Sequence, residues 1–301
     1  MILDYDRIPK PEKMRQSCQA TEVPSPMRDR LSTGLTTSGA PRAAGVTGAA
    51  TVRRMRVAMG TWVALEAAAG SADAAQEAIR AAFVAISEVD RLMHPGREGS
   101  DLAAICTAAP GTRVEVHRRT WEVLCLARRV SEASHGVFDP CLPSSAGRLR
   151  DIEFGSDPVV VCHAPVALDL GGIAKGYAVD RAIEVLLAAG CLSGLVNAGG
   201  DLKVFGAARY PIHLKRGKEV RQTQLANMAL AVSDADAGGR PSGHRGYYSR
   251  ESTQPQLACR YAAVLAPDAA IADALAKCVL LCPTQASAGV LLEFGASRVI
   301  S

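Results

Sequence analysis

The sequence predicts an α+β (mixed α/β) fold, a mixed sheet flanked by helices. Short β-rich runs alternate along the chain with longer segments in which Ala and Leu recur every three or four residues. The 301 residues are 48% hydrophobic, which is enough for a sizeable buried core. Aromatic residues make up only 4%, so this core must be built mainly from Ala, Val and Leu.

The N-terminal segment differs in composition from the rest of the chain. Residues 1–52 are rich in Pro, Gly, Ser, Thr and Arg and have no apolar period. This composition predicts a disordered or poorly ordered arm at 1–52, followed by one domain at 53–301.

The first elements of the domain are a strand and two helices. Residues 57–65 predict a strand. Residues 73–93 predict a helix with apolar stripes, and Ser71 is placed to cap its start. Residues 120–135 predict a second helix, ended by Gly136.

The second half of the chain predicts further strands and a pair of late helices. β-rich residues are expected at 159–161, 202–206, 210–215, 228–232 and 261–266. Helices are expected at 270–281 and at 284–294, the latter capped by Thr284 and closed by Gly295.

The stretch from Asp169 to Asp201 holds two glycine-rich turns separated by one helix. Its first part reads D-L-G-G-I-A-K-G-Y-A-V-D, and helix is expected from Ile173 until Gly190. A glycine turn that opens a helix presents unpaired N–H groups and the positive end of the helix dipole, and anions bind there readily. Lys175 in this first turn is repelled by the same dipole unless an anion shares the site.

The second turn, L-V-N-A-G-G-D, ends at Asp201 and follows an apolar strand. Asn tolerates left-handed backbone conformations and Gly adopts them without steric strain. Two interpretations remain open: a site for a nucleotide diphosphate, or two ordinary tight turns around a core helix. Neither the P-loop pattern nor G-x-G-x-x-G is present in this stretch.

This stretch resembles the core signature of the ApbE family, flavin transferases that use FAD to attach FMN to other proteins. Four further blocks resemble the family in the same order: Met59-Gly60-Thr61, then Asp90 to Met93 with Ser100 to Leu102, then Gly136 to Pro140, and Ala272 to Ala276. Together they span roughly residues 55 to 300.

The resemblance implies that FMN moves from FAD onto a Thr or Ser hydroxyl of an acceptor protein, with release of AMP. FAD is then the substrate, and Mg²⁺ assists phosphoryl transfer. The implied catalytic residues are Asp273, Lys277 and Lys175, and the implied metal ligands are Asp273 and the backbone carbonyl of Ala174.

The resemblance also implies a set of residues that face the flavin nucleotide. They are Met59, Phe138, Asp139, Lys175, Tyr177, Asp180, Asn197, Gly199, Gly200 and Asp201. Simpler interpretations stay open for several of them: Met59 and Phe138 as core residues, Asp180 as a surface helix charge, and Asp139-Pro140 as a plain turn.

Three positions depart from the family pattern. Lys277 stands where the family commonly has a threonine metal ligand, one helical turn after Asp273. Either Lys277 takes the place of the cation, or it points away and Mg²⁺ binds with fewer protein ligands. His244 is the nearest histidine to the family's "H-x-I-x-D-P" block but has the wrong spacing, and Cys106 replaces an asparagine. Two rival functions follow: FAD hydrolysis without an acceptor, or flavin binding without catalysis.

Charge and cysteine usage limit the partners and the compartment. The net charge is +4 without a long Lys/Arg run, which argues against nucleic-acid binding. Nine scattered cysteines without C-x-x-C suggest reduced thiols, and Cys278 and Cys282 are expected to be small buried residues. No apolar leader, lipobox around Cys18 or membrane span is seen, so a cytoplasmic protein is expected, or a periplasmic or membrane-anchored one if the start site is misassigned.

Overall fold

The structure is a computed structural model that describes residues 48–216, 219–235 and 257–300. Most of the predicted arm, Cys18 and the loop with His244 lie outside the described residues. The α+β class is confirmed. The helices are α2 (Ala72–Met93), α3 (Asp101–Thr107), α4 (Arg118–Ala133), η2 (Leu149–Asp151), α5 (Ala174–Ala188), α6 (Ala269–Leu281) and α7 (Thr284–Glu293). The strands are β1 (Ala50–Ala58), β2 (Thr61–Ala69), β3 (Arg113–Glu115), β4 (Ile152–Phe154), β5 (Val159–Cys162), β6 (Ser193–Ala198), β7 (Asp201–Gly206), β8 (Tyr210–Arg216), β9 (Glu219–Leu225), β10 (Ala229–Asp234), β11 (Tyr261–Ala266) and β12 (Ser297–Ile300).

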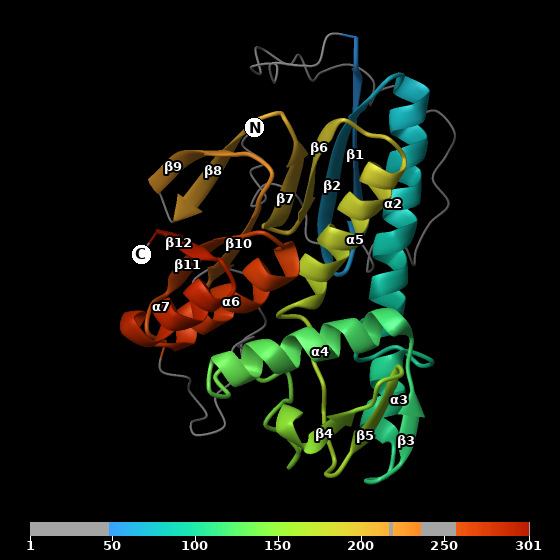
Figure 1. Ribbon diagram of the computed structural model, residues 1–301, viewed down its shortest axis with the longest axis vertical. Helices are drawn as coiled ribbons and strands as arrows, with labels where there is room; N and C mark the ends of the chain where they lie inside the picture. Colours follow the sequence, from blue (N-terminus) through green and yellow to red (C-terminus); the bar gives the residue numbers. More distant parts are fainter. Residues whose placement is uncertain (1–47, 217–218, 236–256, 301) are drawn as a thin grey trace, which may run out of the picture.

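A seven-stranded sheet forms the centre of the molecule (Figure 1). Its strand order is β1-β2-β6-β7-β10-β11-β12, and each neighbouring pair is antiparallel. The sheet is therefore antiparallel and not mixed in strand direction, because hairpins and helical crossovers return the chain beside its previous strand in the opposite sense.

Helices cover one face of this sheet and a hairpin covers the other. In Figure 1, α5 lies between α2 and α6, and all three pack against the sheet. The small side chains of Ala174, Ala178 and Ala182 along α5 are buried and allow this close packing. Leu186 continues the same buried face. The β8–β9 hairpin closes a second apolar cluster on the opposite face. The chain thus forms three layers around two cores.

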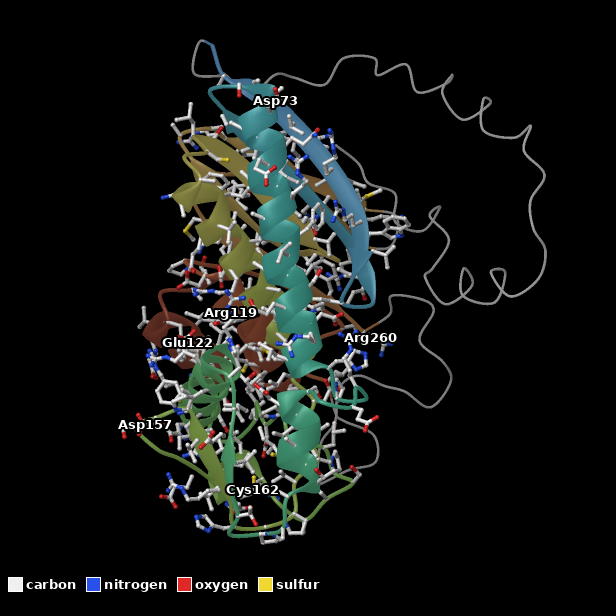
Figure 2. The ribbon with its side chains drawn as sticks, turned by 90° about the vertical axis from the view of Figure 1, so that its right-hand side faces the viewer. Asp73, Arg119, Glu122, Asp157, Cys162 and Arg260 are labelled. Carbon is white, nitrogen blue, oxygen red and sulfur yellow. The ribbon has the colours of Figure 1, made fainter. Side chains whose placement is uncertain are left out.

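A smaller sheet lies at one end of the molecule. Its order is β3-β5-β4, with α4 running between it and the large sheet. Figure 2 shows the separation: Asp73 marks the start of α2 at one end, and Cys162 of the small sheet lies at the other. Glu122 of α4 lies between them.

The predicted strand at 57–65 is wrong, because the chain turns back in its middle. β1 and β2 form a hairpin whose turn is Met59-Gly60, with φ of 51° and 70°. β1 begins at Ala50, before the start of the domain predicted at residue 53. An Arg-rich run forms a strand here because its side chains find partners, as when Arg53 Nε donates to Glu66 at 2.8 Å.

Several predicted helix ends are confirmed. Ser71 accepts a hydrogen bond from the Ala74 amide at 3.1 Å, and Gly190 follows α5 with φ of 77°. Two details are wrong: α4 begins at Arg118, two residues before the predicted start, and α7 begins at Thr284 itself, with Pro283 at the capping position. Pro283 has no side-chain acceptor, so α7 begins without a capping bond from this residue.

Elements of three to seven residues escaped prediction, namely α3, η2, β3, β4, β9 and β12. The three-residue elements are too short to show a period, and β9 consists mostly of exposed polar residues without apolar alternation.

Two further expectations concern membranes and thiols. Across the described residues, no helix combines the length and the apolar character needed to span a bilayer. Cys278 and Cys282 are buried as expected, and burial raises the pKa of the Cys278 thiol to about 12.

Candidate functional site

Two lysines and two aspartates from three distant segments meet beside the start of α5. Lys175 lies in the first turn of α5, and Asp201 is the first residue of β7, after the second glycine turn. Asp273 and Lys277 lie one turn apart on α6. We call these four residues the Lys175 cluster.

The contacts within the Lys175 cluster form a chain of alternating charge. Lys175 Nζ lies 2.5 Å from Asp201 Oδ2 and 3.4 Å from Asp273 Oδ2. Lys277 Nζ contacts the other oxygen of that carboxylate, Asp273 Oδ1. Lys175 Nζ also donates to the carbonyl oxygen of Gly171 at 3.4 Å.

These contacts correct two expectations. Lys175 needs no external anion to offset the dipole of α5, because Asp201 and Asp273 supply the negative charge from within the protein. The alternative in which Lys277 points away from Asp273 is wrong, since its ammonium contacts that carboxylate.

Burial makes the electrostatics of the Lys175 cluster strong. The side chains of Asp201 and Asp273 are 3% and 0% exposed, against 26% for Lys175. Burial alone would lower the pKa of Lys175, but the two carboxylates outweigh it and raise this pKa. Burial and the neighbouring Asp273 raise the pKa of Asp201. Burial also opposes the charge on Asp273, but two ammoniums and an amide hold its pKa below the usual range.

The first glycine turn shapes the start of α5. Asp169 Oδ1 accepts a hydrogen bond from the Gly171 amide at 2.8 Å, and Ile173, the residue before α5, makes no side-chain capping bond. The Gly176 amide in the first turn of α5 is instead capped by Asp273 Oδ2. A Cβ atom on Gly172 would lie 3.5 Å from Phe138 and 3.8 Å from the Cε atom of Lys277. The turn thus runs between a buried aromatic ring and the stem of a lysine.

The second glycine turn places Asp201. Gly199 and Gly200 adopt φ of 66° and 104°, which L-residues with side chains rarely do. A Cβ on Gly199 would also lie 2.5 Å from Thr61 Oγ1. Asn197 Oδ1 accepts from the Gly200 amide at 3.0 Å and fixes the turn.

Helices α5 and α6 hold one another through reciprocal carboxylate–amide bonds. Asp180 on α5 accepts from the amides of Ala269 and Ala270 at 3.0 and 2.9 Å, at the start of α6. Asp273 on α6 accepts in return from the Gly176 amide at 3.2 Å. Asp180 is therefore a buried helix cap and not a surface charge.

The remaining predicted flavin contacts make different bonds in this structure. The Tyr177 hydroxyl donates to Glu122 Oε2 of α4 at 2.7 Å, away from the Lys175 cluster. Asp139 Oδ1 accepts from two backbone amides, at Cys141 and Leu149. Met59 lies in the β1–β2 turn, partly buried against the core.

Sequence reasoning missed one charged residue beside this site. Lys203 of β7 contacts Asp180 at 3.0 Å and Asp268 at 2.8 Å. The alternation of a strand was the available signal, because Lys203 shares a face with Asp201 two residues before it. Cys106, one of the departures from the family pattern, accepts from the Leu168 amide at 3.2 Å, directly before the first glycine turn.

The sequence profile of the ApbE family matches residues 59–159 and 144–294, which together cover more than half of the chain. The chain belongs to the ApbE family.

Relatives of known name agree with ApbE membership. An FAD:protein FMN transferase of Treponema pallidum (strain Nichols) is 27% identical over 161 residues, which are 43% of this chain and 44% of that relative. The aligned region thus spans less than half the length of this curated protein.

Solved structures of ApbE proteins share the fold. The flavinyl transferase ApbE of Pseudomonas stutzeri in its apo form has a TM-score of 0.70 at 20% identity, over 84% of this chain and 91% of that one. An ApbE protein of Thermotoga maritima has a TM-score of 0.72 at 23% identity, over 83% of this chain and 94% of that one.

The Mg²⁺ site implied by the ApbE resemblance does not fit the side chains as they are arranged. Both oxygens of Asp273 already accept from protein donors, Lys277 on one side and Lys175 with the Gly176 amide on the other. In the described part of the chain, no three His, Cys, Asp or Glu side chains gather as metal ligands would. Mg²⁺ requires oxygen ligands that are available to it in octahedral geometry.

Proposed function

We propose that this protein transfers FMN from FAD to a Thr or Ser hydroxyl of an acceptor protein and releases AMP. Membership of the ApbE family supports this activity, and so does the name of the Treponema pallidum relative, an FAD:protein FMN transferase. The observation that carries the proposal is the Lys175 cluster, which gathers two ammoniums beside the glycine turn that opens α5.

The chemistry is a phosphoryl transfer. The acceptor oxygen forms a bond to the phosphorus on the FMN side of the diphosphate, and the bond from that phosphorus to the bridging oxygen breaks. AMP leaves with the bridging oxygen, and the hydroxyl proton passes to solvent. Such transfer depends mainly on positioning and on neutralising the charge of the phosphates.

We assign the charged residues different parts in this reaction. Lys277 binds the diphosphate beside the first glycine turn, while Lys175 holds Asp201 and Asp273 in place. Phe138 lies beside Gly172, and we assign it to the contact with the flavin end of FAD. No step is assigned to a magnesium ion, because the oxygens of Asp273 face protein donors.

The test uses the purified full chain with FAD and a panel of acceptor proteins that carry exposed Thr or Ser. AMP is measured by chromatography and the labelled acceptor by in-gel flavin fluorescence. We expect both products from the wild type and neither from Lys175→Met. AMP without a labelled acceptor would indicate FAD hydrolysis, and bound FAD without AMP a flavin-binding protein. Absence of FAD binding would contradict the proposal.

A further inference from the structure

The two lysines of the Lys175 cluster differ in what their ammonium groups can still bind. An ammonium has three hydrogens to donate. Lys175 Nζ has three acceptors in reach: Asp201 Oδ2, Asp273 Oδ2 and the Gly171 carbonyl. Lys277 Nζ has one acceptor among the described residues, Asp273 Oδ1. Two hydrogens of Lys277 therefore remain for a ligand.

The stem of Lys277 packs against the first glycine turn. A Cβ on Gly172 would lie 3.8 and 3.9 Å from Cε and Cγ of Lys277, so the lysine lies along this turn. The Lys277 side chain is 16% exposed and is therefore only partly covered by the protein. The positive charge of Lys277 thus lies beside the glycine turn that opens α5.

Lys277 also fills the position that a metal ion would need on Asp273. This carboxylate is 0% exposed and offers Oδ1 to Lys277 and Oδ2 to Lys175. A divalent cation at Oδ1 would meet a full positive charge at contact distance, where repulsion in a poorly solvated site is strong.

We propose that Lys277 is the resident cation of this site. Its ammonium binds the diphosphate of FAD as a point charge, where the family resemblance implies Mg²⁺, and FAD binding and cleavage proceed without a divalent ion. The inference rests on the proposed function for its substrate. The filled position on Asp273 can be tested without that function.

The first test measures Mn²⁺ binding to the full chain by electron paramagnetic resonance in the absence of FAD. We expect Lys277→Ala to bind Mn²⁺ at least tenfold more tightly than the wild type, because Asp273 Oδ1 becomes available. Adding Asp273→Asn should remove this gain. If the wild type binds Mn²⁺ as tightly as Lys277→Ala, and Asp273→Asn weakens that binding, the proposal is overturned.

The second test compares FAD affinity and AMP release in EDTA and in excess Mg²⁺. For the wild type and for Lys277→Arg, which keeps the charge, we expect less than a twofold difference. Lys277→Met should bind FAD at least tenfold more weakly in EDTA. A tenfold loss of wild-type FAD binding or cleavage on chelation would refute metal independence.

The matched control is Lys203→Met, which removes another lysine that contacts two aspartates on these elements. Its response to EDTA and to Mn²⁺ should equal that of the wild type. Circular dichroism identifies variants that do not fold, and in that case wild type and Lys277→Arg decide the question. If the wild type cleaves no FAD under any condition, the proposed function fails, and Mn²⁺ binding alone decides the role of Lys277.

Discussion

The Lys175 cluster resembles the Lys203 group, which consists of Lys203, Asp180 and Asp268. The two differ in the other hydrogen bonds that their side chains make. In each, one lysine contacts two aspartates: Asp201 and Asp273 for Lys175, and Asp180 and Asp268 for Lys203.

In the Lys203 group, one aspartate is hydrogen-bonded to backbone amides and the other is half exposed to solvent. Asp180 accepts from two amides at the start of α6, and the side chain of Asp268 is 52% exposed. In the Lys175 cluster, both carboxylates are buried and a second lysine, Lys277, contacts Asp273 while its stem packs against a glycine turn. In both groups a carboxylate that accepts from a backbone amide joins α5 to α6, and the Lys175 cluster adds a second lysine, to which we assign the ligand.

Lys175→Met is expected to lower the free energy of unfolding the most and so to separate the two groups most clearly. Removing this ammonium leaves two buried carboxylates with their mutual repulsion, and losing one partner of a buried ion pair destabilises by about 3–5 kcal/mol. Urea unfolding measures the free energy of unfolding, and AMP release should also be lost. A loss no larger than that of Lys203→Met would show that the two groups are equivalent.

Gly176→Ala should disrupt the packing of α5 against α6, which positions the side chains of both groups. A Cβ there would lie 2.1 Å from the Ala269 carbonyl oxygen, so the helices must separate. We expect a loss of about 3 kcal/mol, at the upper end of the usual effect of overpacking. The matched control is Gly289→Ala in α7, where a Cβ meets nothing within 4 Å and Ala should stabilise by up to about 1 kcal/mol. Equal effects at the two glycines would contradict the close packing.

Lys203→Met should lower the free energy of unfolding less than Lys175→Met or Gly176→Ala does. Asp180 keeps its two amide donors, so we expect a loss of about 1–2 kcal/mol, within the range for a charged group that loses one partner. Thermal and urea unfolding measure it, and the metal response of FAD binding should not change. Altered metal dependence in this variant would assign Lys203 to the ligand site.

The smallest predicted effect is a loss of stability at alkaline pH. Burial alone would lower the pKa of Lys203, but Asp180 and Asp268 outweigh it and raise this pKa above its ordinary value of 10.5. The folded state then holds the proton more tightly, so this stabilisation is complete below pH 10.5 and is lost as the pH rises further. Between pH 9 and 11 the free energy of unfolding should fall by less than about 1 kcal/mol more in the wild type than in Lys203→Met. An equal fall in both would contradict the shift.

Helices with many apolar repeats could be predicted from the sequence. The alanine spacing of α2, α5 and α6 gave their bounds within about two residues, because several turns repeat the same face. The β1–β2 hairpin could not be found in this way, since the run from residue 57 to 65 is apolar on both sides of its turn. Strand pairing, and not local pattern, ends β1 at Ala58.

Part of the candidate site was also visible in the sequence. The Asn197–Asp201 turn and the glycines before α5 were placed correctly, because left-handed turns demand Asn and Gly. The ion-pair partners of Lys175 could not be predicted, because one of them, Asp273, is 98 residues away in the chain. The bonds of Tyr177 to α4 and of Asp180 to the start of α6 likewise join residues far apart in the chain, and the prediction that both face the flavin stays a prediction.

The sequence by itself determined the two glycine turns, the helix between them and the presence of Asp273 and Lys277 on one helical face. These features depend on residues within a few positions of one another, where periodicity and backbone preference act. Only the tertiary structure decided which charges meet. Burying a carboxylate requires a partner, and the packing of α5 against α6 and β7 supplies that partner from distant parts of the chain.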